Sequence, residues 1–224
     1  MPRAVSDPGG RGRFRTPGPV RTSSDTYAAD CQLEPSAPGG HFGTIPAMLN
    51  DRAREALSVQ NYAGRSPIDG VEIVELRRHY DDGGAMTELG RLGEGIHAQV
   101  PGFTVRQINY SEMDPGAIKA FHLHRRQTDV WFIPPDCKML VVLGDVRKGA
   151  KSENAVQRLV LGDGTSRLLR IPPGVAHGVR NLAPTRGRII YFVDVQFDVH
   201  PDRCDEGRLP WDFFGAEVWE VVRG

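Results

Sequence analysis

The sequence has few cysteines, no long apolar run and no excess of charge of either sign. Its three cysteines, Cys31, Cys137 and Cys204, are odd in number and far apart, which fits neither a disulfide framework nor a CxxC metal site and favours a reducing cytoplasm. Lys plus Arg equal Asp plus Glu at 28 each, so no overall basic field favours binding to nucleic acid or to an anionic membrane. No apolar run reaches the length of a bilayer span, and the arginine-containing N-terminus lacks the apolar core of a signal peptide. The composition predicts a cytoplasmic protein without a nucleic-acid or membrane partner.

The N-terminal segment differs in composition from the rest of the chain. Residues 1–44 are rich in Pro, Gly and Arg and contain almost no aliphatic clusters. Such a composition buries too little apolar surface to offset chain entropy, so we expect a disordered tail. Residues 45–67 include PAMLNDRAREALSVQ, in which a proline precedes apolar residues at helical spacing. We expect a short helical lead-in there and one folded domain over residues 68–224.

From residue 71 onward the sequence consists of short apolar runs separated by Gly, Pro and Asp. No helical segments alternate with these runs, which argues against a parallel sheet. The runs predict an all-β antiparallel sandwich or barrel, and the aromatic run LPWDFFGAEVWEVV should fold back over it to bury its rings. The expected strands, each of strand length and rich in β-branched or aromatic residues, are 71–80, 104–112, 117–125, 129–135, 138–147, 155–162, 166–173 and 188–198.

The stretch that carries the most chemistry is GAIKAFHLHRRQTDVWF, residues 116–132. Strand periodicity places His122 and His124 on one face, together with Ile118 and Ala120. A third histidine, His177, follows in the run PPGVAH. We expect the three imidazoles to converge on the lumen of the barrel and to form a functional pocket.

Several motifs in register carry a resemblance to a known family. The chain has QxNxS at 107–111, KAFHLH at 119–124, DVR at 145–147 and IPPGVAHG at 171–178. From residue 68 to the C-terminus it resembles the dTDP-4-dehydrorhamnose 3,5-epimerase family, a branch of the cupin superfamily. The family's DxRGxFxE motif is degraded to DDGGAMTE at 81–88. The resemblance implies a cupin-type antiparallel β-barrel of jelly-roll type that forms a homodimer.

The resemblance also implies an activity and a set of site residues. It implies an isomerase that epimerises a nucleotide-linked 4-keto-6-deoxy sugar by proton abstraction next to the ketone, without a cofactor, in deoxysugar or polysaccharide biosynthesis. His122 matches the family's catalytic base, Tyr191 its catalytic acid, and Asp212 the acid that orients the base. The residues matching its substrate-binding positions are Gln107, Asn109, Lys119, His124, Asp129, Arg147 and His177.

The chain departs from the family pattern at charged positions. Gly83 and Lys119 stand where the family has arginines, which lowers the number of bidentate phosphate ligands. Asp129 stands where the family has the lysine that stabilises the enolate. If no metal is present, we expect Asp129 and His124 to form a hydrogen-bonded pair in which the imidazolium supplies the missing positive charge.

Two other functions remain open at this point. Metal-binding cupins use G-x5-HxH-x4-E and PxG-x2-H-x3-N, and this chain differs only by Asp in place of Glu. A divalent transition metal held by His122, His124, Asp129 and His177 would make a dioxygenase or an isomerase. A sugar-nucleotide binding protein without catalysis is the other possibility. The residues at the metal-cupin spacings are Gly116, His122, His124, Asp129, Pro172, Gly174, His177 and Asn181.

Overall fold

The structure, a computed structural model, describes residues 49–57, 68–93 and 96–221. The chain divides into two units, residues 1–61 and 62–224. In the described part of the first unit, helix α1 (Asp51–Ala56) follows Asn50, whose Oδ1 accepts a hydrogen bond from the backbone N–H of Ala53. The expected tail, residues 1–44, lies outside the described residues, and the expected lead-in, residues 45–67, is described only at 49–57. No helix within the described ranges is long and apolar enough to cross a membrane.

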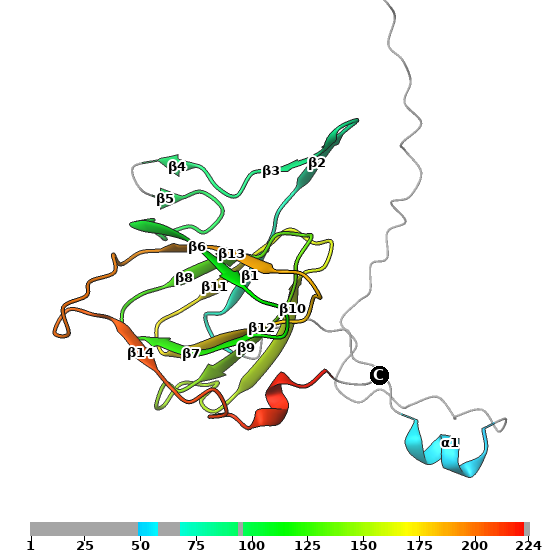
Figure 1. The fold of residues 1–224 in the computed structure, drawn as a ribbon. Coiled ribbons are helices and arrows are strands. Elements are labelled where there is room, and N and C mark those ends of the chain that lie inside the picture. The colour runs from blue at the N-terminus through cyan, green and yellow to red at the C-terminus, as the bar shows by residue number, and fades with distance from the viewer. Residues whose placement is uncertain (1–48, 58–67, 94–95, 222–224) are drawn as a thin grey trace, which may run out of the picture. The chain divides into compact units, whose positions relative to one another are not determined.

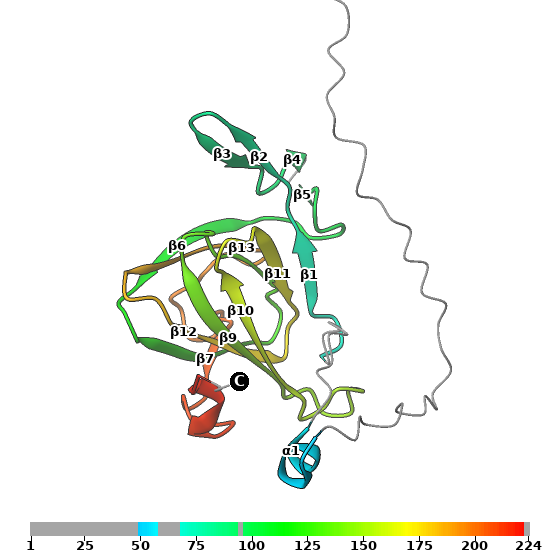
Figure 2. The same ribbon diagram turned by 90° about the vertical axis from the view of Figure 1, so that its right-hand side faces the viewer.

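The second unit consists of two five-stranded antiparallel sheets that face each other (Figures 1 and 2). The first sheet has the order β1 (Glu72–Glu75), β11 (Arg167–Ile171), β8 (Asp129–Phe132), β13 (Gly187–Val193), β6 (Gln107–Met113). The second has the order β10 (Val156–Gly162), β9 (Lys138–Asp145), β12 (Val175–Asn181), β7 (Ile118–His124), β14 (Glu206–Arg208).

Two short ladders complete the described strands, and both are antiparallel. They are β2 (Arg78–Asp81) with β3 (Gly84–Thr87), and β4 (Leu92–Gly93) with β5 (Ile96–His97). Apart from α1, the only helix among the described residues is the 3₁₀ turn η1 (Ala216–Trp219). The architecture confirms the expected cupin-type jelly roll. Each of the eight predicted runs contains a strand, whereas β12 and β14 were not among the predicted strands.

Three apolar layers explain why the central strands are buried along their whole length. In β8, Trp131 points between the sheets, whereas Val130 and Phe132 pack on the outer face of the first sheet with Val100 and Phe103. In β9 the alternation likewise divides its residues between the layer inside the barrel and the layer outside the second sheet. Because both faces of these strands are covered, their sequences are continuously apolar instead of alternating between apolar and polar residues.

The C-terminal segment covers the outer face of the second sheet, as expected from its aromatic content. Trp219 is 2 % exposed, and its ring lies 5.2 Å from that of Phe121 on β7. Phe214 contacts the same Phe121 ring edge-on at 5.0 Å. Burying an aromatic side chain of this size contributes about 1.5–3 kcal/mol. Strand β7, whose other face carries the histidines, is thus held from outside.

A buried ion pair fixes the end of β9. The carboxylate of Asp145 is fully buried and accepts hydrogen bonds from Nε and Nη2 of Arg147 at 2.8 Å each and from the hydroxyl of Ser152 at 2.6 Å. The hydrogen bonds from Arg147 are the main reason that the pKa of Asp145 falls to about 2. Arg147 Nη2 also donates to the carbonyl of Asp69. The pair therefore ties the chain before β1 to the end of β9.

Replacing Arg147 with Ala should leave the buried Asp145 carboxylate unpaired and lower the free energy of unfolding by about 3–5 kcal/mol. Because the pKa of Asp145 is depressed, its stabilisation is present above its usual pKa and lost as the pH falls towards 2. The deficit measured by urea denaturation should therefore shrink in acid. The matched control is Arg186→Ala, which removes an exposed pair with Asp114 and should cost less than about 1 kcal/mol. Equal losses in the two variants would contradict this assignment.

Candidate active site

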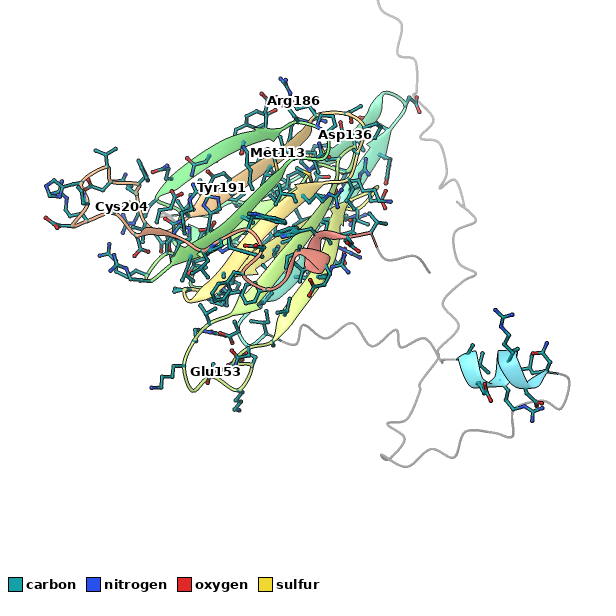
Figure 3. All side chains as sticks on the ribbon, turned by 60° about the horizontal axis from the view of Figure 1, so that its bottom comes forward. Met113, Asp136, Glu153, Arg186, Tyr191 and Cys204 are labelled. Carbon is teal, nitrogen blue, oxygen red and sulfur yellow. The ribbon has the colours of Figure 1, made fainter. Side chains whose placement is uncertain are left out.

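A cavity of about 660 Å³ opens between the two sheets. It is lined by polar side chains from β6, β7, β8, β12, β13 and β14, together with a few apolar ones. Tyr191 on β13 lies toward the end of the barrel from which the loop with Cys204 projects (Figure 3). A concave pocket with convergent polar groups is the expected place for a ligand. Its lining includes eight of the ten predicted site residues: Gln107, Asn109, Lys119, His122, His124, Asp129, His177 and Tyr191.

A β-bulge in β7 decides which of its residues face the cavity. In the ladder with β12, His122 pairs with His177 but Lys119 pairs with Val179, so β7 has one residue more than β12 between these pairs. Lys119 therefore turns inward, and its Nζ donates to the hydroxyl of Ser111 at 3.1 Å. Ile118 and Ala120, expected beside the histidines, line the same cavity but also pack against the outer apolar layer. The strict alternation that we predicted fails at the bulge.

His122 lies beside an acid that the sequence did not reveal. The Oε1 atom of Glu206 on β14 is 3.2 Å from Nδ1 of His122 and accepts a hydrogen bond from Arg208 Nη2 at 2.6 Å. Burial lowers the pKa of His122 to about 4; His177 and Arg208 lower it too, while Glu206 raises it. The ring is therefore neutral near pH 7. The carboxylate favours the tautomer with the proton on Nδ1, which leaves Nε2 as the basic atom.

Asp205 holds β14 against the turn that follows β7. Its Oδ2 accepts hydrogen bonds from the backbone N–H groups of Arg126 and Gln127 at 3.0 and 2.9 Å. Burial raises the pKa of Asp205, but these hydrogen bonds outweigh it and the net shift is downward. The carbonyl of Asp205 contacts Nδ1 of His124 at 3.1 Å. One residue thus fixes both the orientation of His124 and the place of Glu206.

Deeper in the cavity, Asp129 lies between two histidines. Its Oδ1 is 3.8 Å from Nε2 of His124, and its Oδ2 is 3.6 Å from Nε2 of His177. The expected direct hydrogen bond between His124 and Asp129 is absent, because the Gln127 amide donates to Asp129 Oδ1 at 2.7 Å and contacts His124 Nε2 at 3.3 Å. Trp131 Nε1 donates to Asp129 Oδ2 at 3.0 Å. The carboxylate is held by the Gln127 amide and the Trp131 indole rather than by a direct hydrogen bond from His124.

Tyr191 belongs to the sheet opposite His122, since β13 and β7 lie in different sheets. Its side chain is half-buried, and burial raises the pKa of the phenol, followed by the negative charges of Asp129 and Glu206. The phenol therefore keeps its proton at neutral pH. Among the residues that the structure describes, the hydroxyl has no hydrogen-bond partner, so it is available to a ligand.

The wall formed by β6 offers amide groups at the level of Tyr191. Asn109 is the register partner of Tyr191, and its Oδ1 accepts a hydrogen bond from Gln107 Nε2 at 2.7 Å. Gln107 Oε1 accepts in turn from the backbone N–H of Phe197. These amides retain further donors and acceptors that face the cavity, which suits a polyhydroxylated ligand.

Two predicted site residues lie elsewhere. Arg147 is paired with Asp145 at the end of β9, and Asp212 lies on the exposed C-terminal segment; neither lines the cavity. The position expected of Asp212 beside His122 is taken by Glu206. Glu206 lies in a strand of only three residues, which is too short for an alternating pattern to show in the sequence. The sequence offered only the presence of an acid before Trp211 as an indication of its role.

The inner cluster has the donor set of a divalent-metal site. One ligand atom each of His124, Asp129 and His177 lies within 4.8 Å of the others, and all three residues are buried. Two imidazoles with one carboxylate suit iron, manganese, nickel or zinc. His122, the fourth ligand expected for a metal cupin, is outside this group and contacts Glu206 instead. The residues present fit a three-ligand site rather than a four-ligand one.

Comparisons with known proteins agree with one another. A sequence model of the family described as dTDP-4-dehydrorhamnose 3,5-epimerase matches residues 65–211. The spore coat polysaccharide biosynthesis protein SpsL of Bacillus subtilis (strain 168) is 41 % identical over 145 residues, which cover 65 % of this chain and 91 % of SpsL. The probable low-salt glycan biosynthesis epimerase Agl13 of Haloferax volcanii is 23 % identical over 145 residues, covering 65 % of this chain and 89 % of Agl13.

Among solved structures, a dTDP sugar isomerase from Desulfovibrio desulfuricans G20 superposes with a TM-score of 0.57. The two chains are 25 % identical, and the match covers 70 % of this chain and 92 % of the other. The jelly-roll unit is therefore matched over nearly the whole length of that protein.

Replacing Glu206 with Leu should remove the preference of His122 for the tautomer with its proton on Nδ1. In the wild type we expect ¹⁵N NMR of histidine-labelled protein at pH 7.5 to show His122 with its proton on Nδ1. In Glu206→Leu the ring should become a mixture of both tautomers, because the carboxylate that favours Nδ1–H is gone. Asp212→Ala is the matched control and should leave the His122 signals unchanged. A tautomer shift in Asp212→Ala but not in Glu206→Leu would assign the orienting role to Asp212.

Proposed function

The chain belongs to the dTDP-4-dehydrorhamnose 3,5-epimerase family, and on this premise we propose that its cavity epimerises a nucleotide-linked 4-keto-6-deoxy sugar. The observation that carries the proposal is that His122 and Tyr191 line one cavity from opposite sheets. Inversion at a carbon next to a ketone needs a base on one face of the sugar ring and an acid on the other. The reaction supplies a step in deoxysugar or polysaccharide biosynthesis, in line with the assignment of SpsL to spore coat polysaccharide biosynthesis.

His122 is the catalytic base in this proposal. Its Nε2 takes the proton from the carbon next to the C4 ketone, and the electron pair of the broken C–H bond moves into the enolate. Burial keeps the ring neutral, so the base is in its active form near pH 7. Glu206 is the positioning residue, because it holds Nδ1 of the same ring.

Tyr191 is the catalytic acid. Its hydroxyl delivers a proton to the opposite face of the same carbon, which restores the ketone with inverted configuration, and the phenolate regains a proton from solvent. The raised pKa of Tyr191 keeps the group protonated until the enolate forms. The pKa of His122 is lowered and the pKa of Tyr191 is raised, so at neutral pH the first group is ready to accept a proton and the second to donate one.

The remaining cavity residues would bind the sugar nucleotide. Lys119 carries a positive charge at the cavity wall, and its amine donates hydrogen bonds to the hydroxyl of Ser111 and the backbone carbonyl of Glu112. Both are neutral oxygens, so the charge can meet a diphosphate. Arg147 has no part in binding in this proposal, because its guanidinium is paired with Asp145. The proposed substrate-binding residues are Gln107, Asn109, Lys119, His124, Asp129 and His177.

Incubation with dTDP-4-keto-6-deoxyglucose in heavy water tests the mechanism. The wild type should wash deuterium into the carbons flanking the ketone, because abstraction and return are separate steps. His122→Ala should lower exchange by about 10²–10⁴-fold, the usual contribution of a general base. Tyr191→Phe should still exchange but form little inverted product. Binding of the sugar nucleotide by the wild type without any exchange would exclude catalysis and leave a binding protein.

We further propose a cytoplasmic homodimer. The outer face of the first sheet exposes Ile108 and Tyr110 of β6 to 53 % and 60 %. Their register partners on β13, Phe192 and Ile190, belong to the covered apolar layer, so the exposed apolar strip lies along β6, the edge strand of this sheet. An exposed apolar strip of this kind marks an interaction surface. A reducing cytoplasm suits the unpaired Cys137 and Cys204.

A single charge in this strip should separate the protomers. We expect light scattering after gel filtration to give a dimer mass for the wild type and a monomer mass for Ile108→Glu, because the dimer would bury the new carboxylate. Val160→Glu is the control, since Val160 is an exposed apolar residue on β10 of the other sheet. A monomeric wild type would refute the dimer.

A further inference from the structure

We propose that His124, Asp129 and His177 form a binding site for one divalent first-row transition-metal ion. The three residues come from β7, β8 and β12, so two sheets supply the ligands. All three are buried, with exposed fractions of 7 %, 3 % and 2 %. Cupin motifs suggested four ligands, whereas the geometry assigns three and leaves His122 free as a base.

The orientation of the two imidazoles supports the site. His124 Nδ1 contacts the carbonyl of Asp205 at 3.1 Å, and His177 Nδ1 contacts the carbonyl of Val175 at 3.0 Å. A carbonyl only accepts, so each ring donates its Nδ1–H to that carbonyl, and the Nε2 atom of each ring faces Asp129. This second layer of hydrogen bonds is the arrangement by which proteins orient metal-ligating histidines.

The cluster places three metal-ligating groups around one volume. The Nε2 atoms of His124 and His177 both face the buried carboxylate of Asp129. The Gln127 amide supplies donors on the His124 side. On the other side, Nε2 of His177 faces Asp129 Oδ2 at 3.6 Å, and that oxygen takes its donor from Trp131. Each carboxylate oxygen keeps a second lone pair for a metal ion.

The spacing is compatible with coordination after a small movement. Metal–nitrogen and metal–oxygen bonds of about 2.0–2.2 Å place neighbouring ligands roughly 3–3.5 Å apart. The nitrogen–oxygen separations of 3.8 Å to Oδ1 and 3.6 Å to Oδ2 exceed this by a few tenths of an ångström, and the ligand atoms of all three residues lie within 4.8 Å of one another. Two histidines and one carboxylate leave coordination positions open to the cavity. An ion there would place positive charge where a substrate carbonyl oxygen could reach it.

The test uses tag-free full-length protein dialysed against EDTA and titrated with Co²⁺. We expect one Co²⁺ ion to bind per chain and to show the visible d–d absorption of Co²⁺ coordinated by nitrogen and oxygen ligands. Asp129→Asn keeps the shape of the side chain and should weaken binding by about 100-fold or more, beyond the 10–100-fold typical of outer-shell changes. His122→Ala is the matched control and should bind Co²⁺ like the wild type.

Asp129→Asn can also perturb folding, so a second variant, Gln127→Glu, tests the site by an expected gain in Co²⁺ affinity. A second carboxylate beside the site should tighten Co²⁺ binding about tenfold or more, while circular dichroism reports the fold. Absence of binding to the wild type, unchanged binding in Asp129→Asn, or an equal loss in His122→Ala would each overturn the proposal. Deuterium exchange is measured separately on the same samples, so Co²⁺ binding without exchange refutes only the epimerase, and exchange without Co²⁺ binding refutes only the metal site.

Discussion

The hydrogen bonds of Asp205 are the interaction on which the site depends. Its carboxylate accepts hydrogen bonds from the backbone N–H groups of Arg126 and Gln127, and its backbone carbonyl contacts Nδ1 of His124. Strand β14 has three residues and lies at the edge of its sheet, so a ladder this short contributes little by itself. The buried hydrogen bonds of Asp205 fix that strand, and through it Glu206 reaches His122. The base and its orienting acid are therefore parts of one hydrogen-bonded unit.

In the barrel, side chains alternate along each strand between the inner and the outer face, so polar site residues and apolar packing residues occupy different faces. Residues of β9 are apolar on both faces and hold the sheets together, whereas β7 carries histidines inside and Phe121 outside. The bulge in β7 adds Lys119 to the inner face. The close approach at this point requires Gly178 on β12, because a Cβ there would lie 2.4 Å from Cβ of Ala120. The glycine of the AHG motif thus has a packing reason that is separate from any catalytic one.

Asp129 gives this family member its particular character. A carboxylate beside a reacting ketone would oppose developing negative charge, and the structure surrounds it with donors from Gln127 and Trp131 and with two imidazoles. Each oxygen of the buried carboxylate accepts a hydrogen bond, Oδ1 from Gln127 and Oδ2 from Trp131. The proposed epimerase chemistry and the proposed metal site therefore share this acid.

The sequence by itself determined the class of fold and most of the cavity. Apolar runs and turn residues were enough for an antiparallel sandwich or barrel, because strand patterns are local, and the motifs that resemble the epimerase family implied the jelly roll and eight residues of the lining. The sequence did not reveal β12 as a strand, nor β14, since the first contains Gly and His and the second is too short for a period. Only the tertiary structure decided that Lys119 faces inward, that Arg147 belongs to Asp145, and that Glu206 rather than Asp212 contacts His122. The first depends on strand register, and the third on a contact between two strands that are far apart in sequence; side-chain periodicity along one strand carries no information about its partner. Arg147 and Asp145 are only two residues apart, but their pairing depends on the burial of Asp145 and on the contact of Arg147 with Asp69, which only the folded chain provides.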